Sequence, residues 1–142
     1  MSMLLALSLS GIFLILSILH LYWGFGGKWA IASTLPSTKS GEPVLKPAAI
    51  HCFIAAGGLM LFGVAPLLKV GLLSADLPAW ISAYSLWAIT TLFFFRAIGD
   101  FRYVGFFKKI RDTNFGRLDT FLYAPLSFII SLVALLIQVV SD

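Results

Sequence analysis

Hydrophobic residues along this chain are gathered into four long runs that are separated by shorter, more polar stretches. The runs cover roughly residues 3–24, 47–68, 79–98 and 119–140. Each is close to the length of about 20 helical residues that a hydrocarbon core about 30 Å thick requires. None alternates between apolar and polar residues as the strands of a membrane barrel do. The pattern therefore predicts an all-α protein, a bundle of four transmembrane helices.

Local signals predict where these helices begin and end. Pro47 lies at the start of the second run, where a proline is tolerated because the first N–H groups of a helix have no partner. Pro66 and Gly71 are expected to close the second helix, and Asp76 with Pro78 to open the third. The first run lacks a preceding basic residue and a cleavage site, so we interpret it as a retained helix. We expect residues 1–142 to form one integral membrane domain.

Composition agrees with this class of protein. Of the 142 residues, 60% are hydrophobic and 11% are charged, whereas about a quarter of the residues in soluble domains are charged. The one cysteine, Cys52, excludes an intramolecular disulfide and a paired-cysteine redox shuttle. We therefore expect an integral membrane protein without thiol redox chemistry.

Basic residues predict the orientation in the membrane, because short cytoplasmic loops collect Lys and Arg. Only Lys69 lies on the side of the loop between the second and third helices. The other nine lie on the opposite side: Lys28, Lys39, Lys46, Arg96, Arg102, Lys108, Lys109, Arg111 and Arg117. Both termini of this multi-pass protein should therefore be periplasmic if the membrane is a bacterial inner membrane. The net charge of +4 follows from this topology and gives no reason to expect nucleic acid as a partner.

The same topology brings several polar side chains to a similar depth at the cytoplasmic ends of the helices. Ionisable groups at this depth are costly to desolvate and usually face inward, where they pair or line a wet cavity. The sequence therefore predicts a site on the cytoplasmic side that includes His20, His51, Arg96, Asp100, Asp119 and Tyr123.

Arg96 and Asp100 are four residues apart, so they share a face and pair if the third helix continues, with Tyr103 one turn further on. An inward Arg96 with one carboxylate partner keeps spare donors, which suit a carboxylate or phosphate group. The alternative is that Arg96 extends its charge to the lipid headgroups.

His20 and His51 are expected on adjacent helices at equal depth. Neutral imidazoles in that arrangement could ligate a metal or a b-type haem. The alternative is that each forms a hydrogen bond with a hydroxyl group or a backbone carbonyl. Two histidines without a spaced ligand motif are a weak signal, so the cofactor is left open.

Three further features bear on the site. Pro125 leaves the carbonyl of Phe121 without its usual donor, which predicts a kink beside Asp119 and Tyr123. Residues 101–116 carry Arg102, Lys109 and Arg111 opposite apolar residues and are expected to lie as a short basic segment on anionic lipid. The turn-forming stretch STLPSTKSGEP of the first loop could cover the site as a lid.

The stretch HLYWGFGGKWA, residues 20–30, follows the first apolar run. It places aromatic rings, glycines and a lysine at the membrane edge. We expect it to form one wall of the predicted site, with Trp23 and Trp29 as flat surfaces, Tyr22 beside them and Lys28 near an anionic group.

Three stretches of the chain resemble a bacterial membrane-protein family catalogued as domain of unknown function 3995. They are HLYWGFGGKW, KP before the second helix, and RAIGDFRYVGFFKKIRDTNFGRLDTFLYAPL. The resemblance covers nearly the whole chain. A glycine often follows the GG-x-W unit in that family, where this chain has Ala30. The resemblance implies a small multi-span bacterial protein and supplies no activity or catalytic residues.

Three classes of function stay open. The leading hypothesis is an inner-membrane protein that binds an amphiphilic or anionic small molecule, such as a lipid or a quinone-like headgroup, through Arg96, Lys28 and the residues named above. The second is a membrane enzyme or haem-bound electron carrier that uses His20 and His51. The third is a structural or accessory subunit. Membrane lipids are expected partners, and association into a homo-oligomer is left open.

Overall fold

A computed structural model describes all residues, 1–142, and contains helices but no β-strands. Three long helices are α1 (Ser2–Gly24), α3 (Ala49–Lys69) and α4 (Ala79–Ile98). The fourth is a continuous helix, Asn114–Val140, made of α5 (Asn114–Leu118), the π-helical turn η1 (Asp119–Tyr123) and α6 (Ala124–Val140). A short helix, α2 (Ile31–Thr34), lies in the first loop. All four long helices are long and apolar enough to span a membrane, which confirms the predicted fold class.

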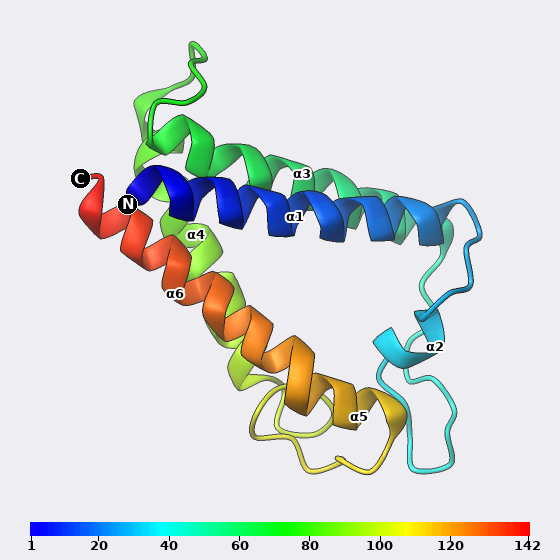
Figure 1. The fold of residues 1–142 in the computed structure, drawn as a ribbon. Helices are drawn as coiled ribbons and strands as arrows, with labels where there is room; N and C mark the ends of the chain where they lie inside the picture. The colour runs from blue at the N-terminus through cyan, green and yellow to red at the C-terminus, as the bar shows by residue number, and fades with distance from the viewer.

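The four helices are arranged as two pairs that diverge. In Figure 1, α1 lies along α3 and α4 lies along α6, and the pairs meet near the two termini and separate towards α2 and α5. The main hydrophobic core is at the converging end, where its buried residues include Leu9, Phe13, Leu86, Ile130 and Ile137. The diverging end leaves space between the pairs.

Hydroxyl groups join the helices within each pair. Ser10 donates its hydroxyl to the carbonyl of Gly63 at 2.6 Å, and Ser17 donates to the carbonyl of Ala56 at 2.8 Å, so α1 is bonded twice to α3. Ser131 donates to the carbonyl of Thr90 at 2.9 Å and joins α6 to α4. Such bonds stabilise helix pairs in lipid, where the hydrophobic effect contributes little to helix association.

Two predicted boundaries differ from the structure. Helix α3 continues through Pro66 to Lys69, because a proline near the end of a helix removes only one hydrogen bond. The last helix begins at Asn114 rather than near residue 119, where Thr113 caps it by accepting a hydrogen bond from the N–H of Gly116 at 2.9 Å.

The irregularity predicted at Pro125 is a π-helical turn immediately before this proline. Across it, the N–H of Ala124 donates to the carbonyl of Asp119, five residues earlier. The wider turn accommodates the missing proline donor without ending the helix. Asp119 and Tyr123 are the first and last residues of η1.

The segment between α4 and α5 is irregular and folds back against the end of α4. Gly99 and Gly105 both have positive φ angles, +88° and +87°, and they lie so close that a Cβ on Gly99 would collide with the carbonyl of Val104. Within the predicted basic segment, Arg102 and Lys109 are exposed, but Phe107 is also exposed and Lys108 is buried. The predicted two-sided division therefore holds only in part.

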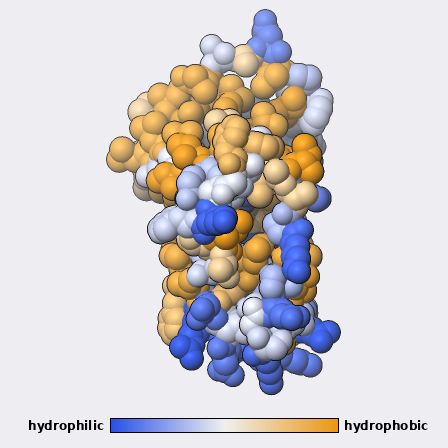
Figure 2. Space-filling model, turned by 90° about the vertical axis from the view of Figure 1, so that its right-hand side faces the viewer, coloured by the Kyte–Doolittle hydropathy of each residue, from blue (hydrophilic) through white to orange (hydrophobic).

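We use the term basic end for the end formed by the loops 25–48 and 99–113. The termini lie together at the other end (Figure 1), where Lys69 forms an ion pair with Asp142. Figure 2 shows the face that includes the basic end, where hydrophilic residues gather over the lower part and hydrophobic residues over the upper part.

Candidate functional site

A cavity of about 590 Å³ lies between the two helix pairs. It is lined by 20 residues from α1, the first loop with α2, α3, α4, η1 and α6, and 13 of them are hydrophobic. A few polar side chains join this apolar lining, which is the usual composition of a small-molecule site. The polar side chains in the wall include His20, Thr34, His51, Arg96 and Tyr123.

Arg96 is the only charged residue that lines the cavity. Its Nη2 donates to Oδ1 of Asp119 at 2.8 Å, while its Nη1 is buried and has no hydrogen-bond partner. A buried donor without a partner carries the full cost of its desolvation. Arg96 is thus a partly exposed cation, with one fully buried and unpartnered N–H group, in a mostly hydrophobic cavity wall.

Asp119 holds two cations behind the cavity wall. Its side chain is fully buried, and its Oδ2 accepts hydrogen bonds from the N–H of Gly105 at 2.7 Å and from Nζ of Lys108 at 3.0 Å. Lys108 is also fully buried and donates to the carbonyl of Gly105 at 2.9 Å. Two positive charges, Arg96 and Lys108, therefore share one carboxylate, and the cluster has a net positive charge.

The predicted pair of Arg96 with Asp100 is wrong. Helix α4 ends at Ile98, and the positive φ of Gly99 turns the chain, so Asp100 does not follow Arg96 along one helical face. Asp100 instead accepts three backbone hydrogen bonds at one oxygen, Oδ1, from the N–H groups of residues 102, 103 and 104 at 2.9, 2.7 and 2.9 Å. Partial desolvation raises the pKa of Asp100, but these backbone donors outweigh it and hold the pKa below its usual value.

The two histidines both line the cavity, and each bonds to the backbone through Nδ1, but their rings are different tautomers. Nδ1 of His20 lies 2.7 Å from the carbonyl of Leu16, which requires that Nδ1 carry the hydrogen and leaves Nε2 as an acceptor. Nδ1 of His51 accepts the N–H of Ala48 at 3.1 Å, so the neutral ring carries its hydrogen on Nε2. The pair therefore offers one free lone pair and one donor, whereas two metal-ligating imidazoles need two free lone pairs.

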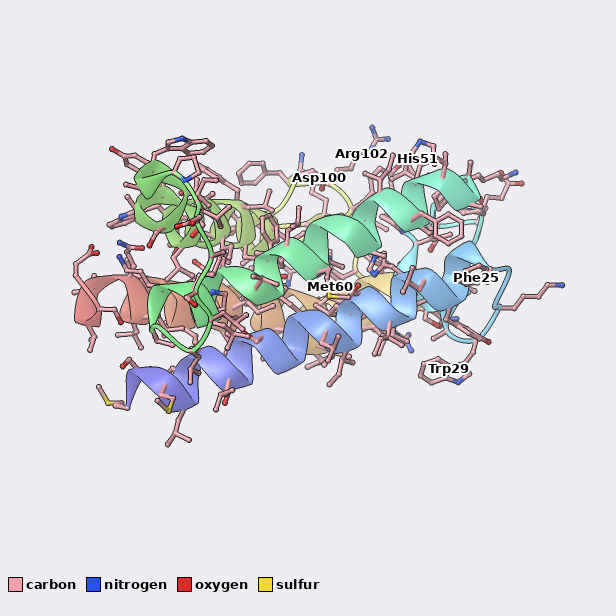
Figure 3. All side chains as sticks on the ribbon, turned by 90° about the horizontal axis from the view of Figure 1, so that it is seen from above. Phe25, Trp29, His51, Met60, Asp100 and Arg102 are labelled. Carbon is pink, nitrogen blue, oxygen red and sulfur yellow. The ribbon has the colours of Figure 1, made fainter.

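The stretch after α1 forms a tight turn, and only part of it reaches the cavity. Trp23 lines the cavity, stacks edge-on against His20 and donates its Nε1–H to the carbonyl of Trp29 at 2.9 Å. Trp29 itself is 69% exposed and projects away from the helices beyond the end of α1 (Figure 3). The expectation that Trp29 forms a wall of the cavity is therefore wrong, and its backbone instead holds Trp23 in place.

Seven of the twelve predicted site residues do not line the cavity. Asp119 lies directly behind it, bonded to Arg96. Tyr22 and Lys28 are exposed on the turn with Trp29. Asp100 and Arg102 lie on the other edge of the molecule from Trp29 (Figure 3), and Arg102 stacks on the ring of Tyr103. The five that do line the cavity are His20, Trp23, His51, Arg96 and Tyr123.

Sequence reasoning missed one contribution to the site. Lys108 gave no signal, because it stands in a Lys-Lys doublet whose neighbour Lys109 is exposed. The first loop, in which the predicted lid lies, supplies Ile31, Thr34 and Leu35 to the cavity wall. This loop is joined to the last helix by Tyr123, whose hydroxyl donates to the carbonyl of Ser33 at 3.3 Å.

Comparison with known proteins identifies the family. No curated protein and no solved structure matches the chain. The family described as "Protein of unknown function (DUF3995)" matches residues 13–134, a range that contains every residue of the cavity wall and of the charged cluster behind it. With most of its length matched, this multi-pass membrane protein belongs to the DUF3995 family.

Proposed function

We propose that this protein binds a small amphiphilic molecule with an anionic group, in the cavity between its helix pairs, on the cytoplasmic side of a bacterial inner membrane. The observation that carries the proposal is Arg96, the one charged side chain in a mostly hydrophobic cavity wall, which is 33% exposed and shares its carboxylate partner with Lys108. An anionic group on a bound ligand would pair with the exposed part of this guanidinium. Charge-assisted hydrogen bonds of this kind are among the strongest in proteins.

Charge balance supports an anion rather than a neutral acceptor. Arg96 and Lys108 share the single carboxylate of Asp119, which leaves the cluster with one net positive charge beside the cavity. No carboxylate lines the cavity. A ligand carboxylate or phosphate would neutralise this charge in a medium where electrostatic interactions are weakly screened.

The apolar lining supports an amphiphile rather than an inorganic anion. Leu59, Phe62, Phe93 and Ile130 line the cavity together with Arg96. An inorganic anion would leave these side chains facing empty space or water. A ligand with a hydrocarbon part would fill that space.

The same geometry gives less support to an enzyme or a haem carrier. A His-Asp acid–base pair needs a free carboxylate beside His20 or His51, but both oxygens of Asp119 are bonded to other donors and Asp100 does not line the cavity. A haem held by both histidines needs a second free lone pair, which the bond from Ala48 to His51 occupies. A visible spectrum of the purified protein tests haem directly, because bound haem gives a Soret band.

The test uses dodecanoate and dodecanol, which have the same chain length and differ in the charged group. Each is added to the protein in lipid nanodiscs, and occupancy is measured by native mass spectrometry. We expect dodecanoate to bind at least ten-fold better than dodecanol, because a hydrogen bond to a charged group contributes about 1.5–3 kcal/mol. Equal occupancy by both molecules would refute the proposal.

Matched variants locate the binding charge. Arg96→Gln should reduce dodecanoate occupancy about ten-fold or more, while Asp119 keeps its bonds to Lys108 and Gly105. Arg102→Gln removes an exposed arginine from the same end of the molecule and should leave occupancy unchanged. If both variants lose occupancy equally, the effect is general surface charge and Arg96 is not the site.

The single thiol provides a second readout. Cys52 lines the cavity and is 8% exposed, so a ligand in the cavity should slow its alkylation by N-ethylmaleimide. Dodecanoate should protect Cys52 in the native protein and should give no protection in Arg96→Gln. Alkylation at the same rate with and without dodecanoate would place the ligand outside the cavity.

A further inference from the structure

We infer that the ligand carries one long hydrocarbon chain and that Gly58 provides the space for it. The inference rests on the proposed function and specifies its ligand. Gly58 lines the cavity halfway along α3, and a Cβ built on it would meet no atom within 4 Å. The space beside Gly58 is therefore not filled by the protein.

The cavity has a polar end and an apolar end along the helix axis. His51, Arg96 and Tyr123 lie towards the basic end, whereas Phe62 and Phe93 pack against the hydrophobic core. The eleven-residue separation of His51 and Phe62 on α3 corresponds to about 16 Å at 1.5 Å per residue. A ligand with its anionic group at the polar end therefore has about 16 Å along α3 for its chain, which would lie along the helices as lipid chains do.

The volume of the cavity favours one chain over two. A methylene group occupies about the volume of one water molecule in the liquid, about 30 Å³. The cavity of about 590 Å³ therefore holds about 20 such groups on that scale. This is enough for a small anionic group with one long chain, whereas a phospholipid with two long chains would have to keep part of its hydrocarbon outside the cavity.

Helix packing does not explain Gly58. At Gly63 a Cβ would be in van der Waals contact with Phe13 and Ser10, at 3.4 and 3.5 Å, so that glycine lies directly against α1. Gly58 makes no such contact, although glycine inside a helix is about 1 kcal/mol less favourable than alanine. Gly57 is its matched neighbour, because a Cβ there also meets no atom but the residue does not line the cavity.

The experiment measures chain-length preference in three proteins: the wild type, Gly58→Phe and Gly57→Phe. Octanoate, dodecanoate and hexadecanoate are added to each in identical nanodiscs, and occupancy is read by native mass spectrometry. We expect Gly58→Phe to lose at least ten-fold occupancy by hexadecanoate relative to Gly57→Phe. Octanoate should bind both variants equally, which also shows that Gly58→Phe is folded. If Gly58→Phe does not fold, Gly58→Val takes its place.

A second arm compares lysophosphatidic acid with phosphatidic acid, which have the same headgroup and one or two chains. The single-chain lipid should bind the wild type at least ten-fold better. Equal binding of both lipids, or equal effects of the Gly58 and Gly57 variants, would overturn the inference while leaving the proposed function intact. Failure of every anion, including octanoate, to bind the wild type would instead refute the proposed function.

Discussion

Arg96 donates to Asp119, which is 23 residues away in the sequence, and not to Asp100, which is four residues away. The bond joins the end of α4 to the π-helical turn that begins the membrane part of the last helix. The other oxygen of Asp119 binds Lys108 and Gly105 of the intervening loop. One carboxylate therefore fixes three segments around the polar end of the cavity.

The first prediction concerns the stability of this cluster. Asp119→Leu leaves Lys108 fully buried without its carboxylate and should reduce the free energy of unfolding by about 3–5 kcal/mol. Asp100→Ala removes an acceptor that resembles a helix cap and should cost about 1 kcal/mol. Denaturant unfolding of both variants in detergent measures the difference. A larger loss in Asp100→Ala would show that the loop depends on Asp100 and not on Asp119.

A double variant serves as the control for this prediction. Replacing the buried ion pair by apolar residues, as in Asp119→Leu with Lys108→Met, should restore part of the stability that Asp119→Leu loses, because no buried lysine charge then remains unpaired. Additive losses from the two substitutions would mean that Lys108 and Asp119 do not interact.

The second prediction is a pH dependence. Because the pKa of Asp100 is lower in the folded protein than its usual value of 3.8, its carboxylate contributes stability above pH 3.8, and this contribution disappears as the pH falls through the folded pKa. The stability difference between wild type and Asp100→Ala should therefore be constant near neutral pH and shrink below pH 3.8. A difference that persists unchanged into strong acid would contradict the three backbone bonds to the carboxylate.

The third prediction concerns Ala30, which has a positive φ of 60°. This left-handed conformation costs an L-residue with a Cβ about 1 kcal/mol and costs glycine little. Ala30→Gly should therefore raise the free energy of unfolding by about 0.5–1 kcal/mol. Ala32→Gly, inside the short helix α2, should lower it by a similar amount. Thermal melts of the two variants should shift in opposite directions.

The fourth prediction tests the close contact in the loop after α4. Gly99→Ala and Gly105→Ala should both destabilise the protein, because each adds a Cβ that collides with backbone and each residue has a positive φ. Gly57→Ala should instead stabilise it by about 1 kcal/mol, since its Cβ meets no atom and alanine favours helix. Limited proteolysis of the loop should also be faster in the first two variants. Unchanged cleavage would mean that the loop does not need this contact.

The fifth prediction is the orientation in the membrane. Nine of the ten basic residues lie on one side of the four helices, so the basic end should be cytoplasmic. Periplasm-specific reporters fused to either terminus should be active, and cytoplasm-specific reporters should be inactive. A cytoplasmic C-terminus would move the cavity to the other side of the membrane.

The sequence alone predicts the positions of the long helices and some of the residues that line the cavity. The predicted third helix, 79–98, coincides with α4, and the first differs from α1 by one residue. Length and hydropathy suffice here because lipid requires that each spanning segment satisfy its own backbone hydrogen bonds. The sequence also predicts that His20, His51 and Arg96 lie at a similar depth in the membrane, because helix ends on the same side of a membrane lie at similar depths.

The tertiary structure decided which of these residues meet. Gly99 ends α4 with a positive φ and separates Arg96 from Asp100, and the loop folds back so that Lys108 is buried beside Asp119. Helical spacing could not predict this, because it describes neighbours only while a helix continues. The divergence of the two helix pairs and the open space at Gly58 depend on side-chain packing between segments that are far apart in the chain. A local pattern of residues cannot predict such packing.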